Sequence, residues 1–320
     1  MESLTARKKQ KFNKTKNQTN KEQKMKTETK EKLEKNYDKY YKIILLIPVI
    51  LLILSFVYLY SFSQKNGDII YKDITLTGGT SVEVNSNIDI AALNTALAER
   101  FEEASVRQVS DILTGEQIAF IVETTADVDE VKPFLEGYLG FELTDENSSI
   151  EFTGSSLSDS FYNQLRLAIL FSFLFMAIVV FIIFRTLIPS VAVIFAAFSD
   201  IVFTIVIIDL FGVKLSTAGI IAILMLIGYS VDTDILLTTR VIKRKAGKVN
   251  SRIFGAFKTG ITMTLTSLVV VLIGYFITAS FSKVFSQIFE VLIIGLLFDI
   301  LNTWTFNAGI IKWYAEKKAI

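Results

Sequence analysis

Neither cysteine nor histidine occurs anywhere in this sequence of 320 residues. Without cysteine, the chain can form no disulfide and no thiolate metal site. Without histidine, it lacks the usual carrier of protons near neutral pH and the commonest metal ligand. Any proton chemistry must therefore use carboxylates, and we expect no metal and no cofactor.

Hydrophobic residues make up 51% of the sequence, with 26 phenylalanines, which is too apolar for an ordinary soluble domain. The net charge of +1 hides a strong asymmetry, because residues 1–42 hold fourteen Lys or Arg and six acids, whereas residues 63–160 hold nineteen acids and five bases. Residues 1–40 are too polar to bury a core, and we expect a disordered basic cytoplasmic tail or a frayed helix. We interpret its charge as a topology signal and not as a nucleic-acid site.

Six apolar runs are long enough to cross about 30 Å of hydrocarbon, at 43–62, 164–184, 190–211, 217–239, 260–281 and 286–311. The 240–258 loop and the C-terminal "KWYAEKKAI" are basic, which favours a cytoplasmic location for both termini. We therefore divide the chain into a tail, a first transmembrane helix at 41–63, an external domain at 64–160, a five-helix bundle at 161–315 and a cytoplasmic C-terminus at 316–320.

The 64–160 segment alternates in the order strand, helix, strand, strand, helix, strand. Period-two patterns predict strands at 80–84, 104–112, 116–125 and 149–154, and helices are expected at 88–103, capped by Asn87, and at 126–140. This is the order of a ferredoxin-like domain. The predicted fold class is an α-helical polytopic membrane protein, with six transmembrane helices and one external α+β ferredoxin-like domain between the first and second.

Paired glycines, Gly78 and Gly79, begin the first strand of this domain. Glycines at such a position permit positive φ or a bulge where backbone meets backbone. We expect a packing or hinge role for both.

Four aspartates lie well inside the spans, away from the span ends, although an intramembrane carboxylate is costly and functional by default. Helical spacing places Asp200 on a stripe of small and polar residues, and Asp299 on another that begins at Gly295. Three threonines of the fifth span form a further stripe. We expect these stripes to face the bundle, because lipid leaves polar groups unsatisfied. Their members are Ala192, Ala196, Asp200 and Thr204; Gly295, Asp299, Asn302, Thr303 and Phe306; and Thr259, Thr262 and Thr266.

The stretch "LMLIGYSVDTDILLTTR" contains the other two aspartates, Asp232 and Asp234. Residues two apart on a helix differ by about 200°, so the two cannot face one narrow cleft. Counted from Arg240, Asp232 is about 12 Å deep and Asp234 about 9 Å. Gly228, one turn before Asp232, permits close approach on that face. Depth therefore favours Asp232.

No Lys or Arg occupies the middle of any span, so the deep acids have no deep cation beside them. Two roles stay open for them. They carry protons, or they are neutral acids hydrogen-bonded to Ser, Thr, Asn or Tyr that hold helices together.

Several words of the sequence resemble the SecD/SecF family of protein-export membrane proteins, in its archaeal SecF form. They are "LTGGTSVEV" at 76–84, "IGYSVDTDILLTTR" at 227–240, "FSD" at 198–200, "FKTGITMTLTS" at 257–267 and "FDILNTW" at 298–304. The resemblance implies an accessory subunit, not an enzyme, that acts with SecD beside the SecY translocation channel on unfolded exported polypeptides. It also implies contact with membrane lipid, and coupling of proton movement to motion of the external domain.

The resemblance also implies site residues. The similar SecD helix carries its acid where Asp232 stands and an asparagine where Asp234 stands, whereas bacterial SecF has its acid at the position of Thr233. Lys258 stands about where bacterial SecF has a functional arginine. The proton-relay candidates are Asp232, Asp234, Asp200, Asp299 and Lys258, and the packing or hinge candidates are Gly78, Gly79, Gly228 and Gly295.

Three alternatives remain beside this reading. A proton-coupled small-molecule exporter of the same resistance-nodulation-division superfamily usually has a duplicated six-span unit and larger external domains. An intramembrane protease would pair Asp200 with Asp232, but the glycine motif typical of such enzymes is missing. A purely structural partner of SecD is the third.

Overall fold

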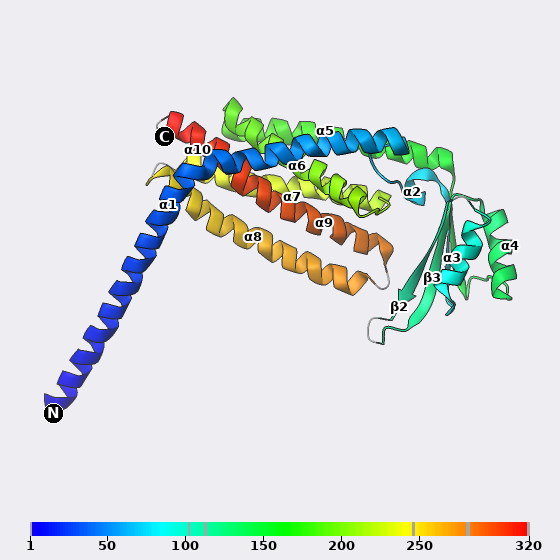
Figure 1. Ribbon diagram of the computed structural model, residues 1–320, viewed down its shortest axis with the longest axis horizontal. Helices are drawn as coiled ribbons and strands as arrows, with labels where there is room; N and C mark the ends of the chain where they lie inside the picture. The colour runs from blue at the N-terminus through cyan, green and yellow to red at the C-terminus, as the bar shows by residue number, and fades with distance from the viewer. Residues whose placement is uncertain (1, 102, 112–113, 245–246, 280–281, 319–320) are drawn as a thin grey trace.

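The computed structural model describes residues 2–101, 103–111, 114–244, 247–279 and 282–318, with side chains from residue 34 onward except 156. A bundle of long helices runs in one direction, and a small sheet lies at one end of it (Figure 1). The described residues include six helices long and apolar enough to cross a membrane. They are Glu34–Asn66, Leu157–Phe184, Leu187–Leu210, Thr217–Ile242, Val249–Thr278 and Lys283–Lys317.

The first helix, α1 (Glu2–Asn66), is continuous and includes Pro48. It projects far beyond the bundle at its N-terminal end (Figure 1). The structure thus has helical backbone over residues 2–40, where the sequence leaves a disordered tail or a frayed helix open. Lys, Glu and Gln make up half of residues 1–40 and are good helix formers, which favours helical backbone there.

The other bundle helices are α5 (Ser155–Phe184), α6 (Leu187–Leu210), α7 (Thr217–Ile242), α8 (Val249–Thr278), α9 (Lys283–Asn302) and α10 (Ala308–Lys317). A short π-helix, η1 (Thr303–Asn307), joins α9 to α10 without a break. In α6 and α7 more than half of the residues in the most apolar stretch of the helix are buried. In the other spans a third or fewer are. These two helices therefore form the centre of the bundle.

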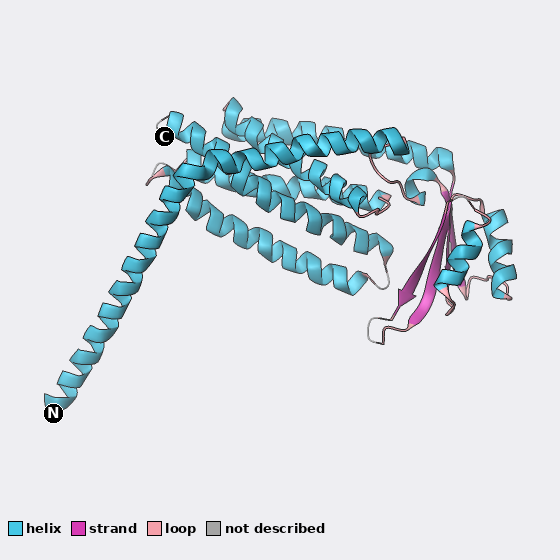
Figure 2. Ribbon diagram, in the orientation of Figure 1, coloured by secondary structure: helices cyan, strands magenta, loops and turns pink. Residues whose placement is uncertain are grey.

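The sheet is antiparallel, with strand order β2-β3-β1-β4. Its strands are β1 (Gly79–Val84), β2 (Ala104–Ser110), β3 (Gln117–Thr124) and β4 (Ser148–Thr153). Two helices, α3 (Ile90–Ala98) and α4 (Val128–Leu139), cover the face that points away from the bundle (Figure 2). Val82 pairs with Val122 and Ile150, and its buried side chain packs with Leu93 and Leu135 of the two helices.

Two predicted helix ends in this domain have different outcomes. The N-cap of α3 is Asp89 and not Asn87, because its carboxylate accepts hydrogen bonds from the amides of Ala91 and Ala92. The C-cap of α4 is Gly140, in the left-handed conformation with φ 78°, as the sequence predicts.

The sheet joins the bundle at a tight backbone crossing. Gly78 follows the single turn α2 (Ile74–Thr77), and a Cβ there would lie 2.6 Å from Ser155 Cα at the start of α5. A Cβ on Gly79 would lie 2.2 Å from the carbonyl oxygen of Thr124. Their φ values are 87° and 140°, so both chain conformation and space exclude larger residues.

Candidate functional site

Three of the four aspartates that lie well inside the spans meet in the centre of the bundle. Asp200 of α6, Asp234 of α7 and Asp299 of α9 are all fully buried. The hydroxyl of Thr303 lies between two of them, 2.8 Å from Asp234 Oδ1 and 3.1 Å from Asp299 Oδ1. We call Asp200, Asp234, Asp299 and the polar side chains that contact them the carboxylate cluster.

Asp200 ties three helices together. Its Oδ2 accepts a hydrogen bond from the Ser230 hydroxyl of α7 at 2.5 Å, and its Oδ1 accepts one from Asn302 Nδ2 of α9 at 2.6 Å. Gain or loss of a proton by Asp200 would therefore change the hydrogen bonds that join α6 to α7 and α9.

Asp234 is held by the π-helix. Asn307 Nδ2 and Thr303 Oγ1 both donate to Asp234 Oδ1, at 2.7 and 2.8 Å. They are the first and last residues of η1. Short π-helices inside α-helices are often found at functional sites, because the extra residue re-aims side chains. Here the π-helix supplies both hydrogen-bond donors that the structure describes for Asp234.

The carboxylate cluster has more acceptors than donors. Among the described residues, Oδ2 of Asp234, Oδ2 of Asp299 and the amide oxygens of Asn302 and Asn307 are buried without a hydrogen-bond partner. The described ion pairs involve none of the three aspartates. Buried acceptors without donors are costly. These four oxygens could therefore each accept a hydrogen bond from a further donor.

The structure corrects the expected placement of Asp232. Its side chain is exposed on the outer surface of α7, as is Gly228, and neither contributes to the carboxylate cluster. A Cβ on Gly228 would meet nothing within 4 Å. Depth along a helix does not give rotation about its axis, and the 200° between Asp232 and Asp234 turns the latter inward.

Three other expected placements also differ from the structure. Lys258 is exposed on α8 and lies outside the cluster. Asp200 and Asp232 are not brought together, so the pair required by the protease hypothesis is missing. Thr262 and Thr266 are exposed as well, contrary to the expected inward stripe. Their hydroxyls donate to backbone carbonyls one turn earlier, which satisfies them within α8 without a bundle neighbour.

The other two stripes do face the bundle. Asp200 lies among buried small residues of α6, and the α9 stripe around Asp299 is buried along its length. Gly295 packs against α7 so closely that a Cβ there would lie 2.3 Å from Leu226 Cδ2. The buried members are Ala192, Ala196, Thr204, Gly295, Asn302, Thr303 and Phe306.

Sequence reasoning missed two members of the cluster, Ser230 and Asn307. Both are polar residues inside apolar spans, and that rarity is the signal that could have identified them. The partner of Asn307 could not be inferred, because this residue ends the π-helix, where the regular α-helical spacing of side chains no longer holds.

Comparisons with known proteins agree with this architecture. Residues 139–317 match the family described as "Protein export membrane protein SecD/SecF, C-terminal". The chain is 43% identical to "Protein-export membrane protein SecF" of Methanothermobacter thermautotrophicus, over 78% of this chain and 85% of that protein. It is 39% identical to the protein of the same description from Methanocaldococcus jannaschii, over 86% and 95%.

A solved structure has a similar fold. It is described as the crystal structure of SecDF, a translocon-associated membrane protein, from Thermus thermophilus. The TM-score is 0.67 at 20% identity, and the match covers 87% of this chain and 38% of that one. With six membrane-length helices, an antiparallel sheet at one end and these relatives, the chain belongs to the SecF family of protein-export membrane proteins.

Proposed function

We propose that this chain assists protein translocation together with SecD, and that the carboxylate cluster couples proton movement to motion of the sheet domain. The observation that carries the proposal is the excess of buried acceptors around Asp234 and Asp299. A proton on either carboxyl group converts an unpartnered acceptor into a donor. Two amide oxygens in the cluster, those of Asn302 and Asn307, have no donor in the described structure.

Proton binding at this place would act on helix packing. The cluster's hydrogen bonds join α6 to α7 and α9, and α7 to η1. Protonation changes which side chains can donate and which can accept, so it favours a different set of interhelical contacts. Only a difference in proton affinity between two helix arrangements can drive such motion. Asp234 and Asp299 are therefore the preferred carriers, and Asp200 the residue that links their state to α6.

The test compares asparagine variants of Asp234, Asp299 and Asp232 in membrane vesicles at matched protein levels. Asn keeps the shape of the side chain and removes ionisation. Asp234→Asn and Asp299→Asn should abolish the part of translocation that depends on the proton gradient and keep the gradient-independent part. Near-normal gradient dependence in both variants would mean that the cluster only holds the helices together. The chain would then be a structural partner of SecD.

A second proposal concerns where SecD binds. Five residues form an exposed stripe along α7, namely Ile221, Met225, Gly228, Tyr229 and Asp232. A carboxylate that faces lipid costs about 2.5–3.5 kcal/mol even on insertion scales. The bare Gly228 leaves room for a close helix neighbour. We therefore assign this stripe to the interface with SecD.

Asp232→Asn should keep its interface with SecD intact, whereas Gly228→Leu should reduce the amount of SecD that copurifies with the chain in mild detergent. Ile182→Leu, an exposed position on α5, is the control. Equal recovery of SecD with Gly228→Leu and with the control would remove this surface from consideration.

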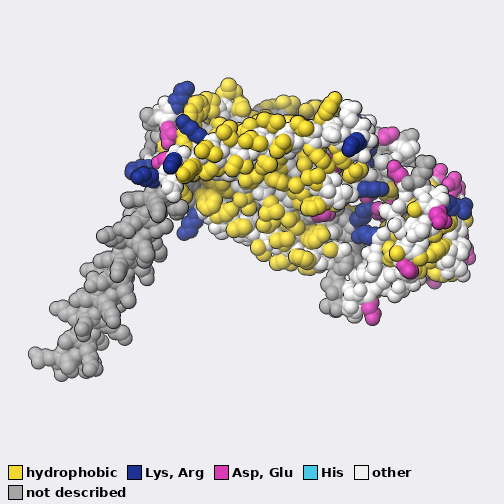
Figure 3. Space-filling view, viewed as in Figure 1, with side chains coloured by type: hydrophobic (Ala, Val, Ile, Leu, Met, Phe, Trp, Pro, Cys, Tyr) yellow, Lys and Arg dark blue, Asp and Glu magenta, His cyan; other side chains and the backbone are white. Residues whose placement is uncertain are grey.

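We further propose that the sheet domain is ferredoxin-like and external, with both termini in the cytoplasm. The element order and the strand order β2-β3-β1-β4 support the first part. A broad apolar surface covers the bundle, with Lys and Arg gathered at the end near the C-terminus and Asp and Glu numerous over the sheet domain (Figure 3). The positive-inside tendency then gives the orientation.

A further inference from the structure

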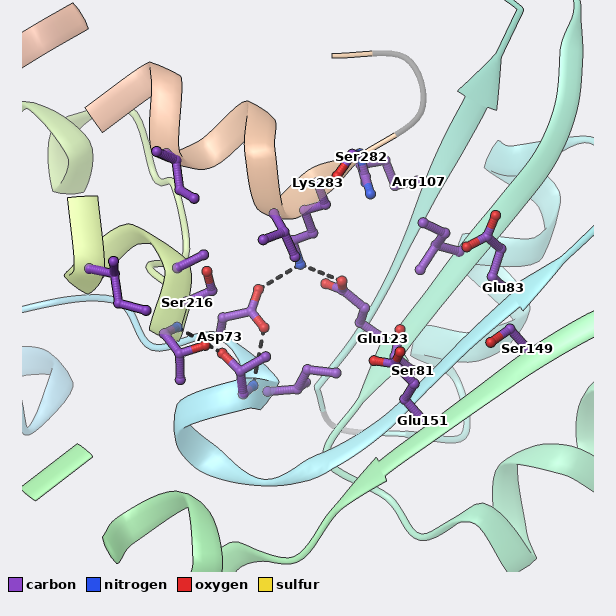
Figure 4. Close-up of a pocket in the computed structure, with 18 residues that line it drawn as sticks. Asp73, Ser81, Glu83, Arg107, Glu123, Ser149, Glu151, Ser216, Ser282 and Lys283 are labelled. Carbon is purple, nitrogen blue, oxygen red and sulfur yellow. Dashed lines mark hydrogen bonds and ion pairs between the residues drawn. The ribbon is translucent and has the colours of Figure 1, made fainter. Parts of the chain in front are cut away.

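One lysine at the start of α9 connects the bundle to the sheet. Lys283 Nζ forms an ion pair with Asp73 Oδ2 at 2.5 Å and a second ion pair with Glu123 of β3. Asp73 caps α2 in the segment that leads from α1 to the sheet. The ammonium group thus joins three parts of the chain, namely α9, this segment and the sheet (Figure 4).

The ion pair crosses a cavity between the sheet and the end of the bundle. This cavity has a volume of about 410 Å³. Glu123 projects into it from the sheet face opposite α3 and α4, beside Ser81 (Figure 4). Space around the contact means that the sheet face is not packed against the helices at this point. A change in the contact can therefore move the sheet without disrupting a hydrophobic core.

Lys283 and the carboxylate cluster belong to one continuous helix. Asp299 lies 16 residues after Lys283, or about 24 Å along the axis. The α9 segment from Lys283 to Asn302 has no proline and no break. Such a helix behaves as a rigid body, so a shift at its cluster end displaces its first turn.

The first turns of α9 are also fixed to α7. Gln287, one turn after Lys283, donates to the Lys214 carbonyl at 2.7 Å and accepts from the Ser216 amide at 2.9 Å. Ser216 is the N-cap of α7, the helix that carries Asp234. Movements of α7 and α9 at the cluster thus reach the same place beneath the sheet.

We infer that Lys283 is a positioning residue that transmits movement of α9 to the sheet domain through its ion pair with Glu123. This inference rests on the proposed function, since it gives the cluster's helix its connection to the moving part. Asp73, which has a nearly buried side chain, keeps the ammonium group in place. Glu123 is then the residue through which the sheet follows a displacement of the ammonium group.

The test uses Glu123→Gln, because this variant removes the arm to the sheet and leaves the Lys283–Asp73 pair intact. Glu151→Gln is the matched control. Glu151 lies on the same sheet face, two strands away, and makes no ion pair among the described residues. The chain has no cysteine, so spin labels can be placed at Asp145→Cys and Phe211→Cys, two exposed positions on the sheet domain and the bundle.

Pulsed electron resonance on the full chain in lipid nanodiscs then gives the distance distribution between the two labels. Glu123→Gln should broaden this distribution, and Glu151→Gln should not. Asp299→Asn, which mimics a protonated cluster, should shift the distribution, and Glu123→Gln should remove at least half of that shift. Lys283→Arg should retain it.

Two results would overturn the inference and leave the proposed function intact. One is a distribution in Glu123→Gln that matches that of the control, which means that the pair does not hold the sheet. The other is an Asp299→Asn shift of undiminished size when Glu123 is changed, which means that movement is transmitted elsewhere. Failure of the proposed function would look different. Asp299→Asn would then give no shift even with Glu123 in place, while Glu123→Gln would still broaden the distribution. That result ends the transmission role and leaves Lys283 as an anchor of the sheet.

Discussion

Replacing Asp200 by leucine should separate the structural part of the carboxylate cluster from its ionisation. The aspartate accepts hydrogen bonds from Ser230 of α7 and Asn302 of α9. Leucine has the same branching and number of heavy atoms but accepts neither bond, so two interhelical bonds are lost and two buried donors lose their acceptor. Asparagine keeps an oxygen for Asn302, and the serine hydroxyl can accept from its amide group.

The expected cost follows from the number of bonds. Interhelical hydrogen bonds in membrane proteins contribute about 0.6 kcal/mol on average and about 1.7 at most. Two such bonds give roughly 1.2–3.4 kcal/mol of lost stability for Asp200→Leu. Asp200→Asn should stay below about 1 kcal/mol, because it can re-form both contacts.

Equilibrium unfolding of the full chain in mixed micelles, at increasing fractions of denaturing detergent, measures both values. Ser230→Ala provides an internal check, since it should cost less in the Asp200→Leu background than alone. An asparagine variant as unstable as the leucine variant would refute the hydrogen-bond reasoning. It would mean that the negative charge of Asp200 itself stabilises the bundle.

Three more predictions concern packing and topology. Gly79→Ala should destabilise the sheet domain by about 3 kcal/mol or more, since the φ of 140° and the Thr124 carbonyl leave no place for Cβ, whereas Gly115→Ala, with open space around it, should cost less in the same thermal melt. Gly295→Val should cost about 1–3 kcal/mol in the unfolding assay, and Leu226→Ala should relieve part of that cost by vacating the space at α7. A topology reporter fused at residue 115 should behave as external and one at residue 247 as cytoplasmic; a cytoplasmic signal at 115 would reject the six-span orientation.

The sequence predicts the linear organisation of this chain well. Apolar runs longer than about 18 residues can hardly be anything but spans, and all six coincide with helices of the structure. Alternating residues such as Val82 and Val84 identify the strands, because one face of a sheet must be buried. The end of α4 at Gly140 follows from the left-handed conformation that glycine adopts freely.

The sequence is less informative about which side of a helix faces the bundle. Thr262 and Thr266 show why, because a threonine can satisfy its hydroxyl on its own helix and then tolerate the outer surface. Polarity in a span therefore does not by itself predict an inward position, and the outward Asp232 shows the same for a carboxylate. The π-helix adds a second difficulty, since no residue of "TWTFN" marks it, and it changes the direction of every side chain that follows.

The two aspartates of α7 illustrate how a single helix can serve two surfaces. Asp234 faces the carboxylate cluster, where Thr303 and Asn307 donate to it, and Asp232 faces outward on the stripe with Gly228. Because the two side chains are about 200° apart on a rigid helix, any rotation of α7 moves both at once. A proton that changes the contacts of Asp234 would thereby change what Asp232 presents to its neighbour. Under the proposed interface with SecD, the second carboxylate, which looks redundant in the sequence, would be the part of α7 through which the cluster and a partner helix affect each other.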